Sequence, residues 1–168
     1  LCDPPRARKE GADGFADIHR IAAEAHIITF HTPFTCEGED ATFHLCDEAL
    51  IGEMKHCKLL INSARGGIVD EAALMASGHA AVIDCWENEP RISEAMLRQA
   101  SIATMHIAGY TRQGKYRATE MVLAHFNRFF HTDAQMVEEL HFPEHQLFDI
   151  EAVSRSLKAQ PERFEQLR

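Results

Sequence analysis

Four short apolar runs, separated by stretches with helical periodicity, limit the folds open to this chain. The runs are IITFH at 27–31, KLLIN at 58–62, AAVID at 80–84 and SIATM at 101–105. Short runs of β-branched and small apolar side chains are typical of buried strands. The stretches that join them are too long for hairpins, so crossover connections and a parallel sheet are expected.

The joining stretches have the spacing and the first residues of helices. FADIHRIAAEA at 15–25 places apolar side chains three and four residues apart, as on one face of a helix. Asp47, Asp70 and Ser93 open the next three stretches as expected N-caps. Helices of this length would cover both faces of the sheet, which predicts a doubly wound α/β fold.

A longer amphipathic pattern follows the last apolar run. It predicts one helix over residues 112–131. The side chains expected to be buried on its apolar face are Met121, Val122, Phe126, Phe129 and Phe130.

Composition excludes several classes of function. The chain has 168 residues, 45% of them hydrophobic, which suffices for one globular domain. A net charge of −9 with scattered Lys and Arg argues against nucleic-acid binding. No apolar run suits a membrane span or a signal peptide, so a cytoplasmic protein is expected. The five cysteines include no CxxC pair and no HExxH-type spacing occurs, so we expect reduced thiols and no metal site.

Polar and titratable side chains collect where the predicted strands end. They are Asp3, His31 to Pro33, Asn62 to Gly67, Asp84 with Glu89, and His106. Ligands of parallel α/β sheets bind beyond the carboxyl ends of the strands, so these residues should converge on one crevice. An acid after the second strand of a nucleotide-binding half holds the ribose hydroxyls and repels a 2′-phosphate, so Asp3 favours NAD over NADP.

Each of these residues also has a purely structural interpretation. Asp3, ahead of two prolines, fits a turn. Arg65, Gly66 and Gly67 fit a plain strand-to-helix turn, although an Arg there is also a planar fork suited to a carboxylate. His106 fits an ordinary core histidine, since the chain has 11 histidines. Only the combination favours a functional site.

Four segments resemble successive signature blocks of the D-isomer-specific 2-hydroxyacid dehydrogenases: HTP, INSARGGIVDEAAL, VIDCWENEP and MHIAGYT. The resemblance covers residues 1 to about 131 and implies a Rossmann-like NAD-binding domain over 1–131. CDPPRA and HIAGYTRQGKYRAT are similar to one member in particular, which oxidises a phosphorylated 2-hydroxy acid in pyridoxal phosphate biosynthesis. That resemblance implies a homodimer and, over 132–168, part of a C-terminal dimerisation region.

The resemblance also implies site residues by position. The catalytic residues would be Arg65, Glu89 and His106. The cofactor-binding residues would be Asp3, Thr32, Asp84 and Gly109, and Tyr110 would lie on the substrate side.

The chemistry of 2-hydroxy acid oxidation suits these residue types independently. The hydroxyl proton must leave with the hydride, and a neutral imidazole at His106 can accept it. A carboxylate at Glu89 would fix the ring tautomer and stabilise the imidazolium. Arg65 would orient the substrate carboxylate, and Asp84 can accept from the nicotinamide carboxamide.

The sequence departs from the family in three places. The glycine-rich phosphate turn and the substrate domain would precede Leu1, so we expect a piece of a longer chain whose first residues end a strand. The link near Gly78 is several residues shorter than in the family, and Met105 replaces a common proline.

Two other functions stay open: a dehydrogenase of glycerate, phosphoglycerate or lactate, and a non-catalytic relative that senses NAD. The residues that hold a substrate phosphate are not identified, because Arg112, Lys115 and Arg117 also fit a solvated helix face. Glu87 has no assigned role and is expected to be solvated.

Overall fold

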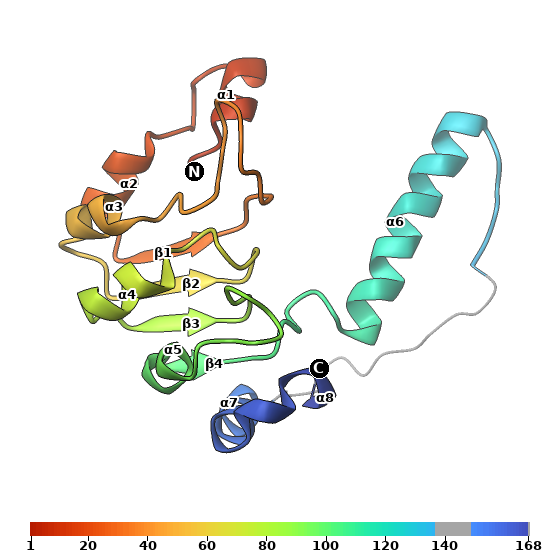
Figure 1. Ribbon diagram of the computed structural model, residues 1–168. Coiled ribbons are helices and arrows are strands. Elements are labelled where there is room, and N and C mark those ends of the chain that lie inside the picture. The colour runs from red at the N-terminus through yellow and green to blue at the C-terminus, as the bar shows by residue number, and fades with distance from the viewer. Residues whose placement is uncertain (137–148, 168) are drawn as a thin grey trace.

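A four-stranded parallel sheet forms the centre of the protein, shown in Figure 1 as a computed structural model that describes residues 1–136 and 149–167. The strands are β1 (Ile27–Phe30), β2 (Leu59–Asn62), β3 (Ala81–Ile83) and β4 (Ile102–Ala103). They follow one another across the sheet in sequence order, all parallel. Each of the four predicted strands is therefore confirmed.

The helices between the strands begin where the sequence predicted. They are α2 (Ile18–Glu24), α3 (Glu48–Glu53), α4 (Glu71–Ser77) and α5 (Glu94–Gln99). Asp47 accepts the backbone N–H of Leu50 at 2.9 Å, and Asp70 accepts that of Ala73 at 3.0 Å. Ser93 caps α5 in the same way, so all three predicted N-caps are confirmed.

The helices pack as one layer on one face of the sheet. Contacts run from α2 to α3, from α3 to α4 and from α4 to α5. Strands added in one direction by right-handed crossovers place their helices on the same side. The strand side chains alternate accordingly: Ile28, Leu60 and Ile83 are buried, whereas Ile27 is 60% exposed and Ile61 is half-buried. The parallel α/β fold is confirmed, but the described residues do not cover both faces as expected.

Helix α6 (Arg112–Phe130) stands apart from the sheet in Figure 1. It begins after Thr111, whose side chain accepts the N–H of Gly114 at 2.9 Å. The five side chains predicted to be buried are exposed by 46 to 77%: Met121, Val122, Phe126, Phe129 and Phe130. That prediction was wrong, because the periodicity identifies an apolar face without showing that anything within the chain packs on it. No described helix, this one included, has the length and apolar character to span a bilayer.

The C-terminal segment packs beside the last strand. It comprises α7 (Ile150–Ala159), the 3-10 turn η1 (Pro161–Arg163) and α8 (Phe164–Leu167). The Ser154 hydroxyl accepts the backbone N–H of Ala103 at 2.9 Å, and Lys158 donates to the carbonyl of Ala100. Leu157 and Phe164 are almost fully buried in the same core as the sheet. A dimerisation role for residues 132–168 stays a prediction, and residues 137–148 lie outside the described part.

The N-terminal residues do not form a strand. Leu1 and Cys2 have no regular structure, and Asp3 begins α1 (Pro4–Glu10) instead. The expectation that these residues end a strand was therefore wrong for the structure as described.

Candidate active site

The loops that follow the four strands lie at the same edge of the sheet, the right-hand edge in Figure 1. They begin at His31, Ser63, Asp84 and Thr104. Parallel strands place their carboxyl ends together, so the predicted convergence of strand-end residues has a structural basis.

His106 and Glu89 form the closest pair of predicted catalytic residues. Nδ1 of His106 lies 2.8 Å from Oε2 of Glu89, and both side chains are half-buried. The carboxylate favours a proton on Nδ1, which leaves the lone pair on Nε2. His106 has a φ of 56°, and its backbone N–H donates to the carbonyl of Asp84 at 2.8 Å. The imidazole is thus presented in one tautomer at the end of β4.

Asp84 holds the loop that carries His106. Its carboxylate is 4% exposed and accepts the hydroxyl of Thr104 at 2.5 Å. It also accepts the backbone N–H groups of Ile107 at 2.8 Å and Ala108 at 2.9 Å. These contacts assign Asp84 a structural task that the sequence did not indicate. The predicted contact with a nicotinamide carboxamide stays a prediction.

Trp86 and Gly66 fix the loop that carries Glu89. The backbone N–H of Trp86 donates to Oε1 of Glu89 at 2.8 Å. The buried indole N–H of the same residue donates to the carbonyl of Thr104 at 2.7 Å. A Cβ at Gly66 would lie 1.8 Å from the carbonyl oxygen of Trp86, so only glycine permits this approach. The loop of Arg65 and the loop of Glu89 therefore touch through Gly66.

Asn62 orients the start of the Arg65 loop. Its buried side-chain amide donates to the carbonyls of Arg65 at 3.0 Å and Cys85 at 3.2 Å. The Arg65 guanidinium is exposed and donates to the carbonyl of Ala64. A pocket beside it is lined by His31, Thr32, Pro33, Phe34, Ser63, Ala64 and Arg65. The predicted residues Thr32 and Arg65 therefore line the same pocket at the ends of β1 and β2.

The other predicted site residues have different surroundings. Asp3 is the N-cap of α1 and accepts the backbone N–H of Arg6 at 3.1 Å, so it begins a helix rather than the turn of its structural interpretation. Gly109 and Tyr110 are exposed between His106 and α6. The ammonium of Lys115 lies 3.3 Å from the centre of the Tyr110 ring. Cofactor and substrate roles for these residues stay predictions.

Glu71 is a buried acid near Glu89 that the sequence analysis did not identify. Glu71 is 7% exposed, and burial raises its pKa to about 7. Its Oε1 accepts the backbone N–H of Glu87 at 2.8 Å. The Glu87 carboxylate lies 2.8 Å from Nε2 of His44, so the expectation that Glu87 is solvated was wrong. Only the burial distinguishes Glu71 from ordinary first-turn acids, and burial cannot be read from this pattern.

His44, Asp70 and Glu87 offer ligand atoms within 4.8 Å of one another. Nδ1 of His44 faces Asp70 at 3.5 Å, whereas Nε2 faces Glu87. A metal ion would take one ring nitrogen, but here each nitrogen faces its own carboxylate. The arrangement is that of an imidazole held between two acids.

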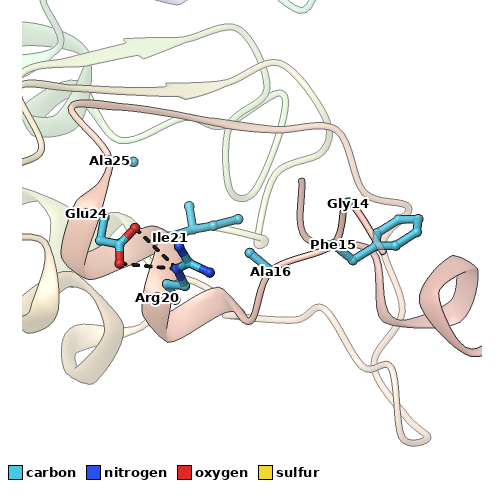
Figure 2. A pocket seen from close by; sticks show the side chains of 7 residues that line it. All are labelled: Gly14, Phe15, Ala16, Arg20, Ile21, Glu24 and Ala25. Carbon is cyan, nitrogen blue, oxygen red and sulfur yellow. Dashed lines mark hydrogen bonds and ion pairs between the residues drawn. The ribbon is translucent and has the colours of Figure 1, made fainter. Parts of the chain in front are cut away.

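A further pocket lies around α2 (Figure 2). It is lined by Gly14, Phe15, Ala16, Arg20, Ile21, Glu24 and Ala25. Its charged side chains pair with each other, with Nε of Arg20 lying 3.2 Å from Glu24. This pocket includes none of the predicted site residues.

Comparison with known proteins places the chain in a family. Residues 2–108 match the profile described as D-isomer specific 2-hydroxyacid dehydrogenase, NAD binding domain. The chain belongs to this family, and the matched segment is its NAD-binding domain. The predicted family and the predicted cofactor are thereby confirmed.

Named relatives are similar over most of this chain. Erythronate-4-phosphate dehydrogenase of Cronobacter sakazakii is 44% identical over 141 residues, which are 81% of this chain and 37% of that protein. Its counterpart in Citrobacter koseri is 46% identical over 134 residues, 77% of this chain and 35% of that protein. The chain therefore spans little more than a third of the length of these relatives.

A solved structure supports the fold. D-lactate dehydrogenase from Aquifex aeolicus, complexed with NAD and lactic acid, is 27% identical with a TM-score of 0.52. The similarity covers 73% of this chain and 42% of that one.

Proposed function

We propose that this protein is an NAD-dependent dehydrogenase of a 2-hydroxy acid, with erythronate 4-phosphate as its substrate. The pair of His106 and Glu89, 2.8 Å apart at the carboxyl edge of the sheet, is the observation that carries the proposal. The names of the relatives that are 44 and 46% identical support this substrate. Lactate, glycerate and phosphoglycerate, the substrates of the alternative dehydrogenases that the sequence leaves open, are the competing substrates to test.

In this proposal His106 removes the hydroxyl proton of the substrate. Glu89 holds the proton of Nδ1, so Nε2 is the nitrogen that accepts. The imidazolium that forms is stabilised by the adjacent carboxylate. Since both groups are half-buried, their attraction is weakened less by water than that of a surface pair.

Arg65 binds and orients the substrate. The guanidinium is exposed beside the pocket at the ends of β1 and β2, where a substrate carboxylate can reach it. Two parallel N–H donors match the two carboxylate oxygens and fix the angle at which the substrate carbon is presented.

The residues at this edge suit NAD. Thr32 and Ser63 bring hydroxyl groups to the pocket that Arg65 lines, and the carboxyl edge of a parallel sheet is where dinucleotides bind. When bound, NAD supplies the hydride acceptor. Thr32 would hold the cofactor, and the Gly109 backbone and one lone pair of Asp84 would contact it.

The proposal is tested by NADH formation. The intact protein, with any residues that its gene encodes beside this chain, should reduce NAD with erythronate 4-phosphate and far more slowly with glycerate, phosphoglycerate or lactate. NAD binding without turnover of any of these acids would contradict the proposal and favour a nucleotide-sensing protein.

His106→Asn separates chemistry from binding. An amide cannot accept the hydroxyl proton, so turnover should fall by at least about a hundredfold, as for loss of a general base. NAD affinity, measured by calorimetry, should stay within about twofold because the ring contacts Glu89 rather than the pocket of Thr32. Retained turnover would remove His106 from the mechanism.

The proposal also includes the cytoplasm as location and a homodimer as the working form. The five free cysteines suit a reducing compartment. The homodimer rests on the resemblance of the C-terminal residues alone and is checked by light scattering of the intact protein.

A further inference from the structure

Glu71 has a position that its helix does not explain. It is the first residue of α4, after the N-cap Asp70. Glu48 and Glu94 occupy the same place in α3 and α5, and both are exposed. An exposed acid in the first turn already stabilises a helix through its dipole, so this effect does not require burial. Only Glu71 of these three carboxylates is buried, at 7% exposed.

The buried carboxylate reaches the loop that carries Glu89. Oε1 of Glu71 accepts the backbone N–H of Glu87 at 2.8 Å. In return the backbone N–H of Glu71 donates to the Glu87 carboxylate at 3.4 Å. Two reciprocal contacts therefore join the start of α4 to the middle of the 86–89 turn.

The same turn positions the base. The Trp86 N–H donates to one oxygen of Glu89, and the other oxygen lies 2.8 Å from Nδ1 of His106. Since Glu87 lies between Trp86 and Glu89, a shift of its backbone changes where both oxygens of Glu89 point. His44 holds the Glu87 side chain from the other side at 2.8 Å.

We propose that Glu71 is a positioning residue for the proposed dehydrogenase reaction: by accepting the Glu87 N–H, it holds Glu89 on His106. This inference rests on the proposed function for its effect on turnover. The acceptor atom matters rather than the charge, because either a carboxylate or an amide oxygen can bind an N–H group. Glu71 does not touch substrate or cofactor.

The charges around Glu71 favour this interpretation. Glu87, Glu89 and Asp70 all act to raise its pKa, in addition to burial. In the described part of the chain no cation acts on this carboxylate, so an ion pair is not what keeps it buried. A carboxyl kept in such surroundings needs its hydrogen bond to the Glu87 N–H.

The test compares three variants of the intact protein with erythronate 4-phosphate and NAD. Glu71→Leu removes the acceptor and should lower kcat by roughly ten- to a hundredfold, the effect of a misplaced catalytic group, with KM for NAD within about twofold. Glu71→Gln keeps an acceptor oxygen and should recover kcat to within about threefold. Glu48→Leu, the matched exposed control, should leave both constants unchanged.

A double-mutant cycle shows whether Glu71 acts through Glu89. Glu71→Leu in a Glu89→Ala background should lower kcat by less than about twofold further, since no Glu89 side chain remains to be held on His106. The proposal is overturned if the two substitutions lower kcat independently, so that their fold-changes multiply. It is also overturned if Glu71→Gln is as slow as Glu71→Leu, or if Glu71→Leu is as fast as the parent.

Amide exchange keeps the proposal testable if Glu71→Leu does not fold or the parent turns over no hydroxy acid. In the unmodified protein the Glu87 amide should exchange at least about tenfold more slowly than its intrinsic rate, and Glu71→Gln should preserve this protection. Exchange at the intrinsic rate would overturn the positioning role. An inactive parent with a protected Glu87 amide would contradict the proposed function but not the contact.

Discussion

Asp84 binds three groups of its own chain with one buried carboxylate. The hydroxyl of Thr104 and the N–H groups of Ile107 and Ala108 all donate to it. Since the backbone of His106 also donates to the Asp84 carbonyl, one residue determines the path of the chain on both sides of the proposed base. Hydrogen bonds of Asp84 therefore hold the loop after β3 against the loop after β4.

Thr104→Val should destabilise the protein by about 1–3 kcal/mol, because it leaves a buried carboxylate oxygen short of a donor without changing side-chain volume much. Urea unfolding followed by circular dichroism measures the change. Thr119→Val, at an exposed position of α6, is the control and should change stability by less than about 0.5 kcal/mol. Equal values for the two variants would show that the Asp84 contact adds nothing.

Glu71→Gln should stabilise the protein more as pH rises. The folded-state pKa of Glu71 is raised from 4.5 to about 7, so the ionised form costs stability. The contribution of the protonated Glu71 carboxyl to the free energy of unfolding is fully present below the pKa of the unfolded state. That contribution is lost as pH rises through the pKa of the folded state. The advantage of the Gln variant should therefore be small near about pH 4 and approach at most about 3 kcal/mol near about pH 8. Thermal unfolding at both pH values measures it.

Glu48→Gln is the control for that pH series, since Glu48 is exposed at the same helix position. Its effect should not change with pH by more than about 0.5 kcal/mol. A pH-independent effect of Glu71→Gln would contradict the raised pKa.

The sequence predicts residues at strand ends better than the contacts that organise them. His106, Glu89 and Arg65 could be found because their types suit the chemistry and their positions follow strands. Thr104, Trp86 and Glu71 could not, because each contributes a hydrogen bond to a group that lies far away in the sequence. Such contacts depend on side-chain burial and loop path, which local pattern does not contain.

At the scale of elements, the 62–67 and 84–90 loops are joined by direct contacts. Asn62 donates to the backbone of both, and Gly66 lies against the carbonyl of Trp86. The strands and N-caps of these elements were predictable because β-branched runs and Asp or Ser caps act locally. The exposure of α6 was not, because amphipathic spacing is the same whether or not a partner lies against the helix.

Gly66→Ala should separate these two loops. The added methyl would lie 1.8 Å from the Trp86 carbonyl oxygen, so the backbone must move. We expect a loss of roughly 1–3 kcal/mol in stability, as for overpacking, together with a large loss of turnover. Urea unfolding and NADH formation measure the two effects.

Gly52→Ala provides the comparison, since a Cβ at Gly52 meets nothing within 4 Å and the residue lies inside α3. That variant should be neutral or more stable by about 0.5–1 kcal/mol. A Gly66→Ala protein as stable and active as the Gly52→Ala protein would mean that the two loops do not depend on their close approach.

Over the whole molecule, the sheet is covered unevenly. One face meets the α2–α5 layer, the β4 side meets α7, and the other face keeps half-buried Ile61 and Val82. Near-continuous apolar strands predicted cover on both faces, because parallel strands are usually buried twice. The composition of the strands therefore predicted the class of fold correctly. It did not predict which face of the sheet the described helices cover.

Leu157→Ala should lower the stability of the whole unit. Leu157 is fully buried in the core shared with the sheet, so its truncation should cost about 2–5 kcal/mol. Ile150→Ala, at the exposed start of α7, should cost less than about 1 kcal/mol. Urea unfolding followed through the fluorescence of Trp86 measures both. An unchanged midpoint for Leu157→Ala would show that α7 and α8 fold independently of the sheet.

The contact between Ser154 and Ala103 blocks the β4 edge of the sheet against pairing with a further strand. A strand extends a sheet by pairing with free backbone groups at an edge, and at β4 the outward N–H of Ala103 is already taken by a hydroxyl. At β1 the residues Ile27–Phe30 pair with β2 on one side. Among the described residues no second strand pairs with β1, whereas a strand that joined beside β4 would first require α7 to detach.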